Sequence, residues 1–286
     1  MKLVIVEDSI SWNLRIQKER KGWRCILNER MKILKLLEEG KITAEEAERL
    51  LEAVGESEFR RRRGFFFGLE SLSDIMSDMM GSIFINSYKT STTTERIEVG
   101  KKKKVIFKVV SGDAEINGKD ISEFVINKNG IIKVIDEDEM LLIKAVSGNL
   151  EIDTPKKIDL EIKGVSGNLV INGIEGNIEI ATVSGDITGK GLKGSFYGKF
   201  VSGDVELEYE KVDGIQIESK SGDVILKIDE NIEAEIEISS RYGDIDCELP
   251  LRDVTKQRNY LRGILNSPKS KIVIRNSYGD VSVERR

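Results

Sequence analysis

One short motif recurs along most of the chain, and its spacing constrains the fold more than any other feature of the sequence. Val-Ser-Gly followed by Asp or Asn begins at positions 110, 146, 165, 183 and 201, and Ser-Gly-Asp returns at 221. The intervals between successive serines of the motif are 36, 19, 18, 18 and 19, and Asn129-Gly130-Ile131 stands at the midpoint of the first interval. Tyr-Gly-Asp variants follow at 242 and 278. A regular period of about 18 residues predicts a repeat architecture.

The segments between these glycines alternate between apolar and polar residues, as in Val205-Glu206-Leu207-Glu208. A period of two is typical of half-buried strands. Glycine allows the positive φ of a sharp turn, and we expect the Asp or Asn after it to hydrogen-bond its own turn. We therefore predict a mainly β fold, a β-solenoid of about 18 residues per coil with two short strands each, preceded by an N-terminal α-helical module.

The sequence predicts four parts. Residues 1–30 form an N-terminal extension with no clear period, and Met31 is a second candidate start of translation. Residues 31–63 read as a helical hairpin, with Gly40 ending its first helix and a capping box opening its second. Residues 64–90 read as an amphipathic capping helix and linker, which we expect to cover the first end of the solenoid, and residues 91–286 form the solenoid.

Two helices of about ten residues bury too little surface to be stable alone, so their apolar stripe must meet something else. Docking on the body of this chain and contact with a second protein both remain open. The basic run Arg60, Arg61, Arg62 and Arg63 beside three aromatic residues suits an anionic membrane surface, although acids in the next helix weaken that interpretation. The candidates for self-association or partner contact are Leu36, Leu37, Leu50, Leu51, Phe65, Phe66 and Phe67.

Composition excludes several functions. The chain has no His and two Cys, which removes His-based catalysis, and we predict no enzyme activity and no cofactor. Cys247 alternates with apolar neighbours and is expected to be a small core residue. The formal charge of −5 argues against a nucleic-acid partner. In-register stacking would align Asp186, Asp204, Asp223 and Asp244; calcium could balance this column, but turn hydrogen bonds suffice, so no metal is predicted.

Residues 252–271 interrupt the last two repeats with six Lys or Arg and one Asp. We expect a solvated loop packed over the final coil, with a docking site for an acidic partner as the alternative. No run of about 20 apolar residues and no secretory leader is visible, so the expected location is the cytoplasm, with association at a membrane surface as a further option.

Two of these features resemble known families. The Val-Ser-Gly-Asp repeats and Ser277-Tyr278-Gly279-Asp280-Val281 resemble the bacterial "putative adhesin" family of domains of unknown function, which is DUF4097-like. The hairpin from Ile33 to Ala47 is similar to the SHOCT-like module that begins YvlB-like envelope-stress proteins. The resemblance covers residues 31–286. It implies a non-catalytic β-solenoid linked to cell-envelope stress or surface attachment, and it supplies no catalytic residues.

We therefore expect a binding or scaffold protein whose helical hairpin contacts a protein partner or a second copy of the chain. Peripheral membrane contact is a further expected interaction. One alternative is a polymer-forming scaffold of the β-helical cytoskeletal type, in which solenoid ends stack into filaments. A second is a polysaccharide-active β-helix enzyme, which would need converging acids in a cleft rather than acids spread along the strands.

Overall fold

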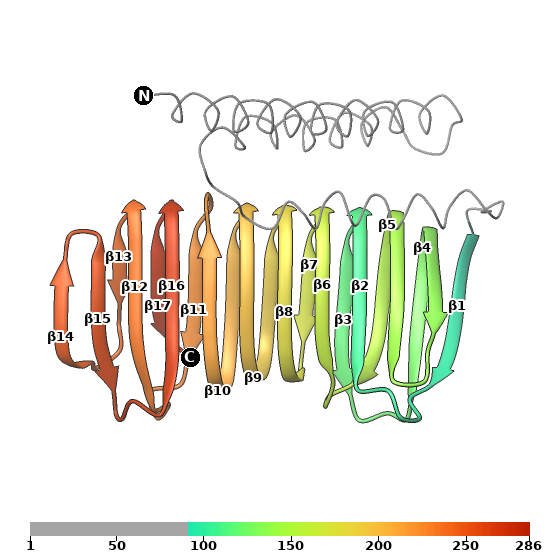
Figure 1. Cartoon of the computed structure of the whole chain (residues 1–286), viewed down its shortest axis with the longest axis horizontal. Coiled ribbons are helices and arrows are strands. Elements are labelled where there is room, and N and C mark those ends of the chain that lie inside the picture. Colours follow the sequence, from blue (N-terminus) through green and yellow to red (C-terminus); the bar gives the residue numbers. More distant parts are fainter. Residues whose placement is uncertain (1–90) are drawn as a thin grey trace, which may run out of the picture. The chain divides into compact units, whose positions relative to one another are not determined.

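The computed structural model describes residues 91–286, and every regular element in this part of the chain is a β-strand (Figure 1). The predictions for residues 1–90, which include the helical hairpin and the capping helix, lie outside the described residues. The strands are β1 (Ser91–Glu98), β2 (Lys104–Ser111), β3 (Ala114–Lys119), β4 (Glu123–Asp136), β5 (Met140–Pro155), β6 (Asp159–Ser166), β7 (Leu169–Asn172), β8 (Glu175–Ser184), β9 (Ile187–Ser202), β10 (Val205–Ser219), β11 (Val224–Ile228), β12 (Ala234–Tyr242), β13 (Ile245–Cys247), β14 (Arg252–Gln257), β15 (Tyr260–Leu265), β16 (Ser270–Tyr278) and β17 (Val281–Arg285).

The strands stack as the coils of a solenoid with two faces. On the first face, β6, β8 and the second half of β9 pair in parallel, so that Leu160, Ile178 and Phe196 lie in one register. On the second face, β7 pairs in parallel with the first half of β9, and Leu169 lies opposite Ile187. These partners are separated in sequence by one motif interval, and a glycine corner joins the two faces in each coil. The predicted mainly β, solenoid-like fold with its regular period is confirmed.

One apolar interior fills the space between the two faces. Alternate residues of each strand point inward, so that Ile180, Leu207 and Ile217 are completely buried. Cys247 is partly buried against this core, and burial raises the pKa of its thiol above the usual value, in agreement with its prediction as a small core residue. The core continues from coil to coil, because every coil contributes the same alternation.

The coils do not stack in chain order, so Asp280 lies between Asp223 and Asp244 in the column expected from in-register stacking. Near one end, the β2–β3 coil lies between the β5 coil and the β6–β7 coil. Near the other, the C-terminal β16–β17 coil lies between the β10–β11 coil and the β12–β13 coil (Figure 1). Coils of similar alternation can exchange places, because each offers its neighbours the same pattern of backbone groups and apolar side chains.

Antiparallel strands complete both ends of the described solenoid. At the first end, β4 runs antiparallel to β5 with Gly130 opposite Gly148, so the motif at the midpoint of the first interval is a corner in reversed direction. Strand β1 pairs antiparallel with β4 and provides the outer edge. At the second end, β14 and β15 form an antiparallel hairpin that pairs with β12. The expectation of a loop over residues 252–271 is therefore wrong, because these residues extend the first face.

Candidate functional site at the corner edge

The predicted contact residues of the hairpin and linker all lie outside the described residues, so the structure brings none of them together. They are Leu36, Leu37, Leu50, Leu51, Phe65, Phe66 and Phe67, together with Arg60, Arg61, Arg62 and Arg63. In the described part of the chain, the glycine corners lie above one another and form one edge of the solenoid, here called the corner edge.

Each corner is tied to the next by a side chain rather than by its own turn. The backbone N–H of Asp204 donates to Oδ1 of Asp186 at 2.9 Å, and the N–H of Asp223 donates to Oδ1 of Asp204 at 2.8 Å. The expectation that Asp or Asn bonds its own turn is therefore wrong for these corners. The ladder follows the spatial order of the coils, which is Asn149, Asp113, Asn168, Asp186, Asp204, Asp223, Asp280 and Asp244.

The corner glycines pack with no room for a side chain. A Cβ built on Gly185 would lie 2.0 Å from the carbonyl oxygen of Gly167, and one on Gly203 would lie 2.2 Å from that of Gly185. Both glycines also adopt a positive φ, near 120°. The corner edge is consequently a stack of backbone cross-linked by carboxylate and amide side chains, and such a stack fixes the backbone from which its exposed side chains project.

Two tyrosines take the motif serine position in neighbouring coils at one end of this edge. The rings of Tyr242 and Tyr278 stack with centroids 5.0 Å apart and planes 17° apart, although the two residues belong to strands far apart in the sequence. Their exposed fractions are 63% and 51%, so both rings remain largely in solvent. Asn276 donates its side-chain N–H to the carbonyl oxygens of Gly222 and Gly279 at 2.9 and 3.1 Å, which fixes the corner that carries Tyr278.

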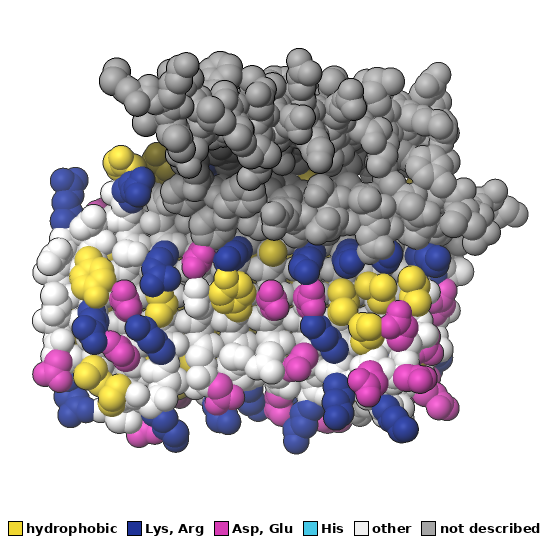
Figure 2. Space-filling model, viewed as in Figure 1, with side chains coloured by type: hydrophobic (Ala, Val, Ile, Leu, Met, Phe, Trp, Pro, Cys, Tyr) yellow, Lys and Arg dark blue, Asp and Glu magenta, His cyan; other side chains and the backbone are white. Residues whose placement is uncertain are grey.

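Charged side chains border the tyrosine pair on both sides. Lys220 and Arg241 are exposed at the outward positions just before their corners, whereas Asp244 and Asp280 are exposed just after theirs. The Oδ1 atom of Asp280 accepts the backbone N–H of Asp244 at 2.8 Å. Figure 2 shows hydrophobic side chains beside Lys or Arg over the upper ends of β12 and β16. The pair is thus an apolar platform between cationic and anionic groups.

Many acids on the two faces pair with bases in other strands. Lys227 Nζ lies 2.6 Å from Glu206 Oε1, and this hydrogen bond raises the pKa of Lys227 and lowers that of Glu206. Lys193 lies within 3.0 Å of Glu175 and 3.3 Å of Glu210, and these hydrogen bonds raise its pKa. These acids support inter-coil contacts, and they do not converge on a common point.

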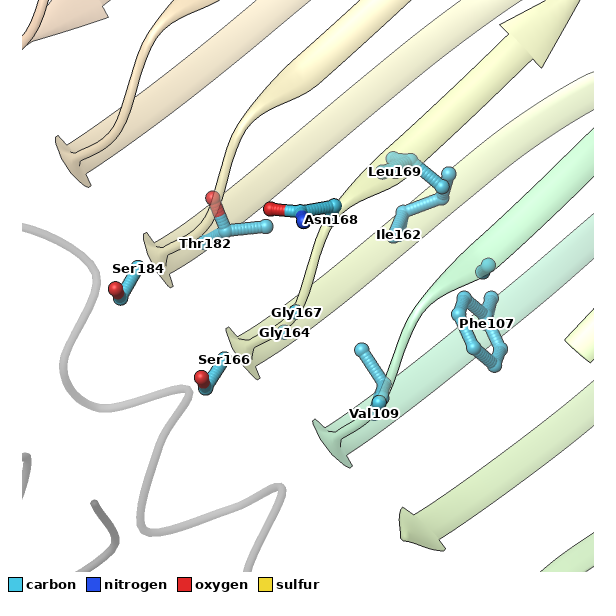
Figure 3. Close-up of a pocket in the computed structure, with 12 residues that line it drawn as sticks. Phe107, Val109, Ile162, Gly164, Ser166, Gly167, Asn168, Leu169, Thr182 and Ser184 are labelled. Carbon is cyan, nitrogen blue, oxygen red and sulfur yellow. The ribbon is translucent and has the colours of Figure 1, made fainter. Parts of the chain in front are cut away.

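A small void lies inside the corner between β2, β6 and β8. Val109, Gly164 and Thr182 occupy the same register in successive coils and line this void (Figure 3). Its volume of about 10 Å³ suits at most one water molecule. Thr182, one of the lining residues, has a buried Oγ1 without a hydrogen-bond partner in the protein. The void is too small to bind an organic ligand.

No group of three or more His, Cys, Asp or Glu side chains in residues 91–286 is arranged to hold a metal ion. The corner acids accept backbone hydrogen bonds at the positions where we considered calcium. Within the same residues, no helix has the length and apolar character to cross a bilayer.

These features define a β-solenoid repeat protein with a cross-linked corner edge. Its sequence places it more narrowly. The chain belongs to the Toastrack DUF4097 family, whose profile matches residues 65–284, and residues 28–58 match the profile of the SHOCT-like domain. The adhesin-type and SHOCT-like resemblances predicted from the repeats and the hairpin are confirmed. No curated protein matches the chain.

Several solved bacterial structures are similar over about two thirds of the chain. One, described as a "putative cell adhesion protein" from Clostridium sporogenes, is 15% identical with a TM-score of 0.43, covering 68% of this chain and 100% of its own. A "putative adhesin" from Bacteroides fragilis is 13% identical with a TM-score of 0.31, covering 68% and 98%. A "putative lipid binding protein" from Parabacteroides distasonis is 13% identical with a TM-score of 0.29, covering 68% and 97%.

Sequence reasoning missed the tyrosine pair as a candidate site, although its signal was present. Tyr242-Gly243-Asp244 and Tyr278-Gly279-Asp280 are copies of the motif in which a large aromatic residue replaces a small hydroxyl residue. The substitution shows that these two corners differ from the others. That the two rings meet follows only from the position of the β16–β17 coil beside β12.

Proposed function

We propose that this chain is a non-catalytic binding protein in which Tyr242 and Tyr278, exposed on the solenoid, contact a protein partner. The stacked, exposed ring pair on a cross-linked corner carries this proposal. Tyrosine and arginine dominate the binding energy of many protein interfaces, and Arg241 lies directly beside the pair. The resemblance to adhesin-type and envelope-stress proteins supports a role in bacterial surface interaction or cell-envelope stress.

The rigidity of the corner supports a binding role in a second way. Ser240 Oγ donates to the carbonyl of Gly279 at 3.0 Å, and Asp244 and Asp280 are joined through the corner ladder. Because the coils fix the backbone beneath both rings, a partner would not have to order them on binding. Less conformational entropy is then lost in the complex.

Binding rather than catalysis also agrees with the way the acids are used. In the described residues, corner acids accept backbone N–H groups and many face acids pair with lysine or arginine, so these acids serve the fold. The edge strand β14 disfavours the filament alternative, because all its side chains are exposed and its pairing with β15 is interrupted at Arg252–Thr255. Charges and bulges at an edge oppose strand-to-strand stacking between molecules.

For the N-terminal module we retain the proposal of self-association or partner contact through Leu36, Leu37, Leu50 and Leu51. We place the protein in the cytoplasm, with contact to an anionic membrane surface through Arg60–Arg63 as a second attachment. Deleting residues 31–63 is expected to lower the oligomeric mass in light scattering while the β circular dichroism spectrum persists. An unchanged mass would remove self-association by the hairpin.

The tyrosine proposal is tested by site-specific cross-linking in a cell-envelope extract of the source organism. A photoreactive residue at Arg241, beside the pair, is expected to give a discrete product, whereas one at the exposed Lys190 on the second face serves as control. An excess of unlabelled full chain should abolish the product, and an excess of Tyr242→Ala/Tyr278→Ala chain should compete at least tenfold less. Equal competition by both chains would refute the proposal.

A further inference from the structure

The valines of the repeated motif do not face the core. Val109 points inward and belongs to the core, so Val110, its neighbour in the same strand, points outward. The same reasoning applies to four more coils, because the residues before their corner serines share this register. The result is an outward apolar row along the corner edge, here called the valine stripe, of Val146, Val110, Val165, Val183 and Val201.

Part of the valine stripe is buried as deeply as the core. Val146, Val110 and Val165 are 7%, 6% and 2% exposed, yet they are absent from the core cluster. The strands that carry the stripe pair with their neighbours in the stack, and these pairings place no further described strand over the row. Outward valines of an uncovered sheet would remain accessible, so their low exposure marks this row as a candidate docking surface.

A row of cations accompanies this part of the stripe. Lys133, Lys144, Lys108 and Lys163 stand directly opposite one another in β4, β5, β2 and β6. Figure 2 shows Lys or Arg side chains gathered in a row over these strands. Lys163 Nζ also lies 2.8 Å from Glu161 Oε1, so acids already accompany this row. An occupant that carries acids beside an apolar side would match both the cations and the valines.

We propose that residues 69–83 of this chain dock on the valine stripe as an amphipathic helix, parallel to the axis of the solenoid. The stripe spans four strand spacings, or about 19 Å, and a 15-residue helix is about 22 Å long. Leu72, Met76 and Met79 belong to the apolar face of this segment, which recurs every three or four residues. Its polar face carries acids at 70, 74 and 78, and residues 64–88 contain no Lys or Arg.

The path of the chain allows this docking. Ser91, the first residue of β1, pairs with Gly130, which in turn pairs with the corner glycine Gly148. The chain therefore enters the described solenoid at the corner edge and at the end where Val146 lies. Seven residues separate position 83 from Ser91, and an extended stretch of that length reaches about 23 Å. The segment thus lies along the edge of the coils, whereas strands β1 and β4 already occupy the end of the stack.

Hydrogen–deuterium exchange of the full chain tests the proposal. We expect the amides of residues 72–83 to be protected, and Val146→Ser/Val110→Ser/Val165→Ser to speed their exchange at least tenfold. The matched control is Val170→Ser/Ile225→Ser, at outward positions of the second face, which should leave this protection unchanged. Equal exchange of residues 72–83 in the stripe variant and the wild type would overturn the proposal.

Two further measurements keep the test decisive. If the stripe variant loses its β circular dichroism spectrum, Met76→Ser/Met79→Ser changes the docked segment without touching the solenoid. It should give the same loss of protection, whereas Ser73→Ala/Ser77→Ala on the polar face should not. Protection that grows with protein concentration would mean that a second copy covers the stripe, and this would overturn docking within one chain. None of these variants changes Tyr242 or Tyr278, so the result does not depend on whether the tyrosine pair binds a partner.

Discussion

Alanine at a corner glycine should destabilise the solenoid far more than alanine at a glycine in an open turn. Gly185 has φ 122°, and its Cβ would lie 2.0 Å from the carbonyl oxygen of Gly167. Gly191 also has a positive φ, 62°, but nothing lies within 4 Å of its added Cβ. Both substitutions therefore put alanine at a positive φ that favours glycine, but only Gly185→Ala also creates a steric clash between coils.

The magnitudes follow from this geometry. An ordinary van der Waals contact begins near 3.4 Å, so the 2.0 Å approach requires the corners of Gly185 and Gly167 to separate by about 1.4 Å. That movement weakens the bonds from Asp186 N to Asn168 Oδ1 (3.0 Å) and from Leu169 N to Asp186 O (2.9 Å). Two hydrogen bonds at about 1 kcal/mol each and a backbone strain of about 1–3 kcal/mol give about 3–5 kcal/mol for Gly185→Ala. Gly191→Ala should cost about 1–2 kcal/mol, since only the left-handed conformation opposes it.

Urea unfolding of the full chain, followed by circular dichroism and compared at the transition midpoint, measures the difference. We expect the midpoint of Gly185→Ala to fall at least twice as far below the wild type as that of Gly191→Ala. Midpoint shifts are compared because repeat proteins can unfold in more than one step. Equal midpoints for the two variants would refute the idea that corner glycines are required by contact between coils.

Three further predictions concern individual side chains. Asp204→Ala should lower the free energy of unfolding by about 1–2 kcal/mol in urea titration, because it leaves the N–H of Asp223 without its acceptor, whereas Asp204→Asn should cost less than about 0.5 kcal/mol. Tyr209→Phe should raise the free energy of unfolding by about 1 kcal/mol, since the Tyr209 hydroxyl is buried without a hydrogen-bond partner. Lys227 lowers the pKa of Glu206, so the stability that this pair contributes is present above the unfolded pKa near 4.5 and is lost as pH falls through the lower folded pKa. In acid unfolding, Glu206→Gln should therefore make the free energy of unfolding depend less on pH in this range.

Each of these predictions has an outcome that would contradict it. If Asp204→Asn were as costly as Asp204→Ala, the charge rather than the acceptor atom would matter at the corner. Loss of stability in Tyr209→Phe would show that the hydroxyl has a partner, such as a buried water. A Glu206→Gln chain with the wild-type acid profile would show that Lys227 adds no coupling to folding.

The strands and turns within each repeat could be predicted from the sequence, whereas the order in which the repeats lie beside one another could not. Val205-Glu206-Leu207-Glu208 alternates with period two, and the structure places Val205 and Leu207 in the core. Alternation depends only on adjacent residues. The motif valines escaped this reasoning because Val109 and Val110 are both apolar, and the pattern alone does not show which of them faces the core.

The corner ladder illustrates the same limit. The sequence indicates that Asp or Asn follows each glycine and can accept a hydrogen bond, but Asp223 could be paired with either Asp244 or Asp280. The structure places Asp280 next to Asp223 and Asp244 beyond it. The same rearrangement stacks Tyr242 on Tyr278, so the candidate binding site exists only because a later coil lies beside an earlier one.

By itself, the sequence determined the period of the repeat, the half-buried strands and the glycine corners, since each depends on residues close together in the chain. Only the tertiary structure decided the order of the coils, the reversed direction of β4 and the hairpin of β14 and β15. Coils with the same alternation of side chains fit against one another almost equally well, so local pattern leaves their order open. The choice among these arrangements depends on how the connections and edges close over the whole stack, which is a property of the complete fold.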